Sequence, residues 1–217
     1  MEIPKWSKSY LKQERVQLVS EAVKEAESKT SAEIVPMIVR RSSTVGHVPV
    51  IVLTVLMLLF LLLEGPTWQA DYLGESWLWY LLNIVILLLL SSFISRSTFI
   101  QRIFTSRSDQ QDQVEMRAEL EFYESNIKNT KDATGILLFA SLMEHRVVVL
   151  ADKAITDKFS TETWTEICNL LVQGIKKGNM GIAFSNAIKR CGEILEADFP
   201  IQPDDENELH DHLIIKE

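Results

Sequence analysis

The sequence predicts an α/β protein with three layers, in which helices cover both faces of a mixed sheet and a two-helix transmembrane hairpin is inserted. Three observations predict this fold class. Apolar residues recur at helical spacing in several polar segments. Three short runs rich in β-branched residues are typical of strands. Two long runs, Val48–Leu63 and Trp77–Ile94, contain no charged side chain.

Residues 1–44 predict a helix followed by a strand, and form the first part of the α/β domain. Between Ser9 and Lys29 the apolar side chains fall on one helical stripe. The run Glu33–Val39 (EIVPMIV) is short, apolar and β-branched, which predicts a strand. Pro36 cannot donate a hydrogen bond to a ladder, so this strand is expected to lie at a sheet edge or to carry a bulge.

Residues 45–95 predict the transmembrane hairpin, with spans at about 48–63 and 77–94. At 1.5 Å per residue the first run covers roughly 24 to 28 Å, close to a hydrocarbon core of about 30 Å. Trp77, Trp79 and Tyr80 cluster at the start of the second run, as in an aromatic belt. The alternative, two buried core helices, is disfavoured because neither run has a polar face.

The charges around the hairpin predict its orientation. The connecting segment, Glu64–Ser76, has three acidic residues and no Lys or Arg. The opposite flanks carry five arginines: Arg40, Arg41, Arg96, Arg102 and Arg107. The positive-inside rule then predicts a multi-pass protein of the cell's inner (plasma) membrane with both termini cytoplasmic. Cys168 and Cys191 would face a reducing compartment as free thiols.

Residues 96–200 predict the second part of the α/β domain, and residues 201–217 an acidic tail. The expected elements are a helix at Ser108–Asn129, strands at Gly135–Leu142 and Arg146–Ala151, and helices at Thr161–Lys177 and Met180–Glu196. The N-terminal segment buries too little surface to fold alone. Its strand is therefore expected to join the C-terminal strands in one sheet. The alternative, two independent pieces, leaves that strand without a partner.

Composition and the missing motifs argue against several functions. A net charge of −8 argues against nucleic acid as a partner. The chain has no Walker, GxGxxG, GxSxG, HExxH or CxxC motif and no common phosphatase signature. The spans contain no acidic or basic residue, which argues against a transport path.

Three acidic residues are the candidate metal ligands. Asp152 follows a predicted strand, Asp157 lies five residues later, and Glu33 begins the first strand. Ligand sites of open α/β sheets gather at strand ends, and carboxylates suit a hard cation such as Ca²⁺ or Mg²⁺. The alternative is structural: Asp152 caps a turn and Asp157 begins the next helix.

Other polar residues support weaker hypotheses. His145, in the turn Glu144–Arg146, is a candidate general acid or base, and the alternative is a solvated turn. Asn83 in the second span is expected to pin the hairpin or a homo-oligomer, unless it is a tolerated amide. The tail carboxylates, Asp204 to Glu208, could bind a divalent ion, dock on a basic partner, or simply aid solubility.

The order of several blocks resembles the TPM-domain membrane protein family, in a subgroup described as phosphatases of uncharacterised function. The matching blocks are KTSAEIVPMIVRRSS, the two spans, TGILLFASLMEHRVVVLADKAI, RCGEILEADFP and PDDENEL. The resemblance implies helices around a small mixed sheet. It also implies the phosphatase activity and calcium binding associated with some members.

Together these patterns predict an integral membrane protein whose cytoplasmic domain binds or assembles with an unidentified protein partner at the membrane surface. A metal-dependent phosphatase is the alternative function. Catalytic residues are not identifiable from the sequence.

Overall fold

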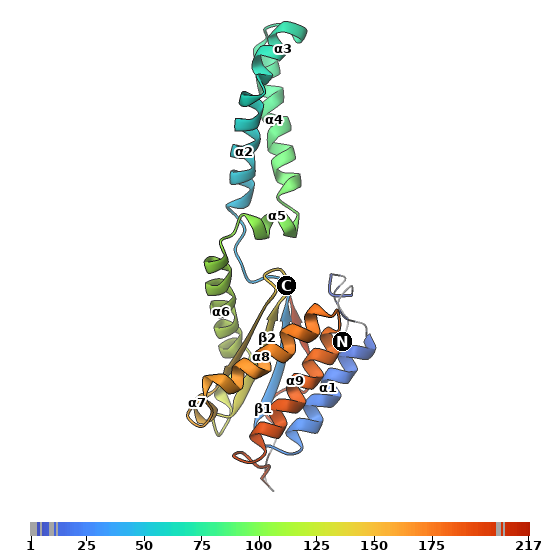
Figure 1. Ribbon diagram of the computed structural model, residues 1–217, viewed down its shortest axis with the longest axis vertical. Helices are drawn as coiled ribbons and strands as arrows, with labels where there is room; N and C mark the ends of the chain where they lie inside the picture. The colour runs from blue at the N-terminus through green and yellow to red at the C-terminus, as the bar shows by residue number, and fades with distance from the viewer. Residues whose placement is uncertain (1–3, 5, 9–10, 12, 203–204, 206) are drawn as a thin grey trace. The chain divides into compact units, whose positions relative to one another are not determined.

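The computed structural model describes residues 4, 6–8, 11, 13–202, 205 and 207–217, and the chain divides into two compact units (Figure 1). Met1–Ser42 and Gln111–Glu217 form the first, here the α/β unit. Ser43–Gln110 forms the second, here the hairpin unit. The hairpin unit thus includes residues 96–110, which the sequence analysis assigned to the α/β domain.

The α/β unit is built on a four-stranded mixed sheet in the order β3-β2-β1-β4. Its strands are β1 (Glu33–Val39), β2 (Gly135–Ser141), β3 (Arg146–Ala151) and β4 (Ile214–Lys216). Strand β1 runs parallel to β2 and β4, whereas β3 is antiparallel to β2. The α/β class is confirmed, and the N-terminal strand does join the C-terminal ones. Strand β4 was not predicted.

The prediction that β1 lies at an edge or carries a bulge is wrong, because β1 lies between β2 and β4. The N–H of Glu33 donates to the Thr134 carbonyl, just before β2. The N–H of Ile34 points to the opposite side of β1 and donates to the Glu27 carboxylate. By alternation, Pro36 also faces the β4 side. Pairing with β4 begins only at Met37, so the missing N–H of Pro36 costs no ladder bond.

Helices cover both faces of the sheet (Figure 1). Alternate strand residues point to opposite faces. One face, with Ile34 and Leu138, packs against α1 (Gln13–Glu27), α8 (Thr161–Lys176) and α9 (Met180–Leu195). The other, with Met37 and Phe139, packs against α6 (Arg107–Glu124) and the 3₁₀ helix η1 (Ile127–Asn129). The short helix α7 (Lys153–Thr156) follows β3.

The hairpin unit consists of four helices: α2 (Val48–Leu62), α3 (Gly65–Leu73), α4 (Trp77–Ile94) and α5 (Thr98–Ile103). Among the described residues, α4 is long and apolar enough to cross a membrane. Helix α2 has 15 residues, about 22 Å, which is short of a full span. It would count as a second span only when taken with α3, from which it is bent by 59°.

The segment predicted to connect the two spans, Glu64–Ser76, is largely helical, because α3 occupies Gly65–Leu73. Pro66 lacks the N–H that a continuing helix would need, so α2 stops and the chain restarts as α3. Glu64 takes the left-handed conformation at the break, with φ of 54°.

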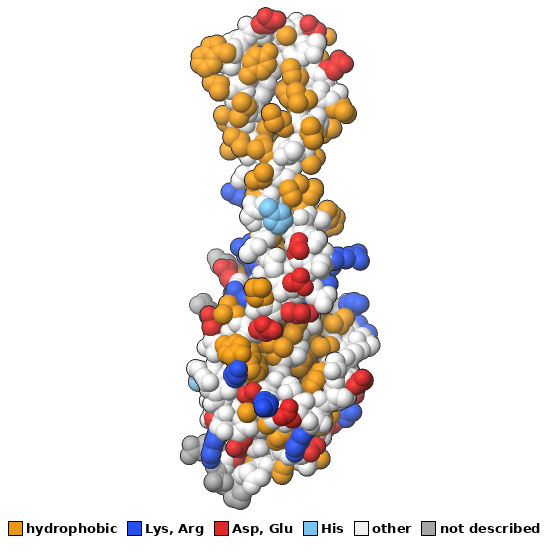
Figure 2. Space-filling view, turned by 90° about the vertical axis from the view of Figure 1, so that its left-hand side faces the viewer, with side chains coloured by type: hydrophobic (Ala, Val, Ile, Leu, Met, Phe, Trp, Pro, Cys, Tyr) orange, Lys and Arg blue, Asp and Glu red, His pale blue; other side chains and the backbone are white. Residues whose placement is uncertain are grey.

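The hairpin unit exposes its apolar side chains (Figure 2). Only 6% of the residues of α4 are buried, and the buried residue is Ser91. On α2, the buried residues are Val48 and Val52. Leu62 and Phe93 are 80% and 74% exposed.

Candidate functional site

The direction of β3 decides which end of the sheet carries the predicted metal ligands. Because β3 is antiparallel to β2, Asp152 at its end lies beside the first residue of β2, where its N–H donates to the Gly135 carbonyl over 2.9 Å. Gly135 in turn pairs with Glu33. Glu33 and Asp152 thus share the amino edge of β1 and β2. The carboxyl ends of β1, β2 and β4, where ligands usually bind, form the opposite edge.

The three predicted ligands are not gathered into a metal site. Asp152 caps α7, since its Oδ1 accepts a hydrogen bond from the Lys153 N–H over 2.7 Å. Asp157 is exposed at the other end of that helix. Across the described part of the chain, no three His, Cys, Asp or Glu side chains are placed to hold a metal ion. The structural alternative holds for Asp152. Asp157, however, ends a helix and does not begin one.

Glu33 instead binds the C-terminal tail. Its Oε1 accepts from the Glu208 N–H at 3.0 Å, and its Oε2 from the Leu209 N–H at 3.3 Å. These bonds hold the tail against the amino edge before it forms β4. Burial raises the pKa of the Glu33 carboxyl above its usual range. Of the predicted tail carboxylates, Asp204 and Glu206 lie outside the described residues.

A second carboxyl, that of the half-buried Glu27, lies close to Glu33. Its Oε1 accepts from the Ile34 N–H over 2.9 Å. Burial, together with the nearby carboxylates of Glu33, Asp211 and Asp205, raises the pKa of Glu27 to about 8. These four carboxyl groups line a cavity of about 210 Å³, here the acidic cavity. Sequence spacing gave no sign of it, because the tail that completes it is nearly 180 residues away.

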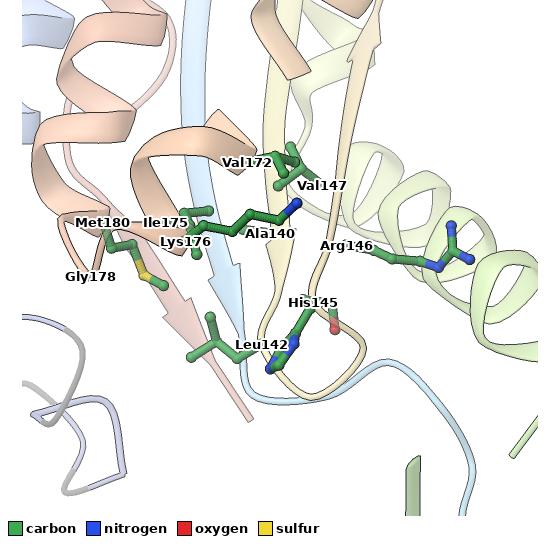
Figure 3. Close-up of a pocket in the computed structure, with 11 residues that line it drawn as sticks. Ala140, Leu142, His145, Arg146, Val147, Val172, Ile175, Lys176, Gly178 and Met180 are labelled. Atoms are coloured by element: carbon green, nitrogen blue, oxygen red, sulfur yellow. The ribbon is translucent and has the colours of Figure 1, made fainter. Parts of the chain in front are cut away.

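The carboxyl edge of the sheet holds a larger hollow, here the carboxyl-edge pocket, of about 430 Å³ (Figure 3). It lies between the β2–β3 turn and the α8–α9 connection. Its lining is Ala140, Ser141, Leu142, His145, Arg146, Val147, Val172, Ile175, Lys176, Gly178 and Met180. This volume falls in the range of small-molecule sites.

A buried hydrogen-bond network fixes the turn beside this pocket. Glu144 is 2% exposed, and its carboxylate accepts from the Ser42 N–H at 3.2 Å and from the Ser141 hydroxyl. The Ser42 hydroxyl donates to the Ser141 Oγ at 2.9 Å. His145 takes a left-handed φ of 54°, which is uncommon for a residue other than glycine. The expected solvated turn is wrong for Glu144, whose carboxylate is structural.

The cationic side chains of the pocket differ in direction (Figure 3). The Lys176 stem runs from the last turn of α8 across the apolar lining, and His145 lies at the turn near Leu142. Arg146 points away toward α6, where its Nη1 donates to the Gln111 Oε1 at 3.4 Å. Lys176 and His145 are therefore the cationic or titratable groups nearest the cavity.

In the hairpin unit, two polar side chains of α4 form hydrogen bonds to other helices of the same unit. The Asn83 amide donates to the Gln69 Oε1 over 2.5 Å, and Gln69 is itself buried. The Ser91 hydroxyl donates to the Pro49 carbonyl over 2.6 Å. Of the two predicted roles for Asn83, these contacts match the one that pins the hairpin, joining α4 to α3.

Comparisons with known proteins give a likeness of fold. No family model matches this chain, and no curated protein matches it. Among solved structures, the chain is similar to the BA42 protein of the psychrophilic bacterium Bizionia argentinensis. The TM-score is 0.60 at 19% sequence identity, over 94% of each chain. At this identity the similarity shows the fold alone.

Proposed function

We propose that this chain is a membrane-anchored binding protein of the TPM-domain type, with its hairpin unit in the lipid bilayer and its α/β unit in the cytoplasm. The observation that carries the proposal is the exposure of α4. A core helix of a soluble protein would be mostly buried, whereas α4 is almost wholly exposed and carries no charge. An apolar surface of this kind indicates a membrane or protein contact.

The internal polar pairs of the hairpin unit support a lipid environment. Lipid offers no hydrogen-bond partners, so polar groups there must pair within the protein. The Asn83–Gln69 and Ser91–Pro49 bonds do this between helices. With α3 included, the α2 segment makes the second, bent span of a multi-pass protein.

Helix α5 has the features of an interfacial helix. It lies crosswise at the end of the α2–α4 pair (Figure 1). Phe99 and Ile103 are 69% and 58% exposed, and Arg102 lies in its last turn. Exposed apolar side chains beside a basic residue suit the headgroup region of a membrane.

The membrane proposal is tested by extraction and by cysteine accessibility. The protein should stay with membranes in alkaline carbonate. In a variant with Cys168 and Cys191 replaced by serine, Glu75→Cys should react with an impermeant maleimide outside intact cells. Lys177→Cys, the matched control, should react only after permeabilisation. Release by carbonate, or outside labelling of Lys177→Cys, would refute the anchoring or its orientation.

The TPM assignment rests on sequence resemblance. Two of the resembling blocks contain β1 and the β2–β3 hairpin, which lie far apart in the sequence yet pair in one sheet. The proposed role is binding or assembly with a protein partner at the membrane surface, as a monomer or homo-oligomer. Co-purification of a partner that needs the α/β unit would support it.

A metal-dependent phosphatase is the second proposal, and the acidic cavity is the feature that favours it. Its four carboxyl groups concentrate negative charge that attracts Ca²⁺ or Mg²⁺, although the described side chains do not form a ready-made cluster of metal ligands. The full chain would be assayed on an aryl phosphate with each ion and with chelator, beside Glu33→Gln and Asp152→Asn. Metal-dependent turnover lost in Glu33→Gln alone would support a site in this cavity. No turnover would leave the binding role.

A further inference from the structure

The carboxyl-edge pocket combines an apolar interior with a cationic rim. Ala140 and Met180 are buried in its walls, and Leu142, Val147 and Ile175 are half-buried around it. Apolar side chains lining a hollow of about 430 Å³ are the usual setting for the apolar part of a small ligand.

The ionisable side chains that line this pocket, Lys176, His145 and Arg146, are all basic. Lys176 and His145 lie at the rim, and the lining residues, all within the described ranges, include no carboxylate. This is unusual in a chain of net charge −8. The carboxylate of Glu144, next to His145 in the chain, is buried and accepts hydrogen bonds from Ser42 and Ser141. A cleft lined by charges of one sign concentrates ligands of the opposite sign.

The walls of the pocket are held in place before any ligand arrives. On one side, the Glu144 network ties the β2–β3 turn to Ser42 after β1. On the other, Gly178 with φ of 73° closes the α8–α9 connection, and the Arg15 guanidinium donates to its carbonyl at 3.2 Å. A preformed site loses less entropy on binding.

We propose that the carboxyl-edge pocket binds an amphipathic anion: one acyl or aryl chain that carries a single carboxylate or phosphate. The chain lies against Leu142, Val147 and Met180, and the anionic group meets Lys176 and His145. The inference deepens the proposed binding function and rests on it. The anion comes either from a free amphiphile or from a membrane lipid.

The test uses the full chain in phosphatidylcholine nanodiscs, with methionine methyl groups labelled for NMR. Met180 lines the pocket, while Met37 is buried on the opposite face of the sheet and reports the intact fold. Decanoate is titrated beside decanol and decyltrimethylammonium, which also enter lipid but lack the negative charge. A parallel sample contains phosphatidic acid in the nanodisc and no decanoate.

Decanoate should shift the Met180 methyl signal saturably and leave Met37 unchanged, whereas decanol and the ammonium should bind more weakly. Lys176→Gln should weaken decanoate about fivefold, the scale of an exposed ion pair. Lys177→Gln, an exposed neighbour outside the lining, is the matched control and should change nothing. Val172→Phe should fill the pocket and abolish the shift.

A Met180 shift with phosphatidic acid alone would identify a lipid as the source, and one with decanoate alone a free amphiphile. Equal binding of decanol and decanoate, equal effects of the two lysine variants, or no saturable shift would overturn the proposal. Membrane insertion is read by cysteine labelling, so a failure of this site is distinguishable from a failure of anchoring.

Discussion

Replacing Glu27 by glutamine should stabilise the α/β unit, and more so at high pH. Glutamine keeps an oxygen that can accept from the Ile34 N–H, but it carries no charge. Glu27 lies beside Glu33, Asp205 and Asp211 in the acidic cavity, where ionisation is opposed by burial and by like charges. Glu27→Gln removes that penalty and preserves the hydrogen bond.

The sign and size follow from the raised pKa. The pKa of Glu27 is about 8 in the folded protein, against 4.5 for the ordinary side chain. The folded state therefore holds a proton that the unfolded chain releases, so stability falls as pH rises from about 4.5 through about 8. A pKa shift of this size would lower the free energy of unfolding by about 5 kcal/mol at pH 9, relative to a carboxyl with its ordinary pKa. Partial hydration of the site reduces this loss. We expect the advantage of Glu27→Gln to grow by about 2 kcal/mol between about pH 5.5 and about pH 9.

The assay is urea unfolding of the full chain in nonionic detergent, followed by far-UV circular dichroism at each pH. Glu21→Gln is the matched control, because Glu21 is exposed on the same helix and lies outside the acidic cavity. An advantage of Glu27→Gln that is no larger at pH 9 would show that the Glu27 carboxyl is not destabilised by ionisation in the folded protein. So would an equal response of Glu21→Gln.

Three further predictions concern packing. Gly135→Ala should lower the free energy of unfolding by about 2 kcal/mol, because the added Cβ would lie 2.2 Å from the Ile127 carbonyl oxygen; an unchanged urea midpoint would contradict this. Asn83→Leu should weaken the hairpin by about 1 kcal/mol by leaving Gln69 unpaired, seen as faster proteolysis at α3; wild-type cleavage rates would argue against the pin. Cys191 is fully buried and its pKa is raised to about 12, so it should react with thiol reagents only after unfolding, and labelling of the native protein at Cys191 would show that the α9 core is open.

Local sequence patterns predicted the elements that are built from a mainly apolar run of residues. Glu33–Val39 and Trp77–Ile94 form β1 and α4 with the predicted bounds, because uninterrupted apolar runs leave little choice of boundary. The predicted helix 108–129 instead breaks after Glu124, where Asn126 takes φ of 57°. Strand β4 escaped prediction because its three residues are stabilised by pairing with β1, not by their own pattern.

The candidate sites depended on information that spacing does not contain. Asp152 was placed at the usual ligand-binding edge because it follows a strand, but the antiparallel direction of β3 puts it at the other edge. The half-buried Glu27 and the buried Glu144 accept hydrogen bonds from partners that meet them only after folding, Ile34 in one case and Ser42 and Ser141 in the other.

Composition and periodicity were enough to predict that this chain is α/β, that its N-terminal strand needs distant partners, and that two uncharged apolar runs interrupt the domain. Those properties follow from side-chain periodicity and composition, which are local. Only the tertiary structure decided strand order and direction, the bend between α2 and α3, the tail held by Glu33, and the pocket at the carboxyl edge. Each of these depends on contacts between residues far apart in the sequence, and no local pattern specifies which distant segments will meet.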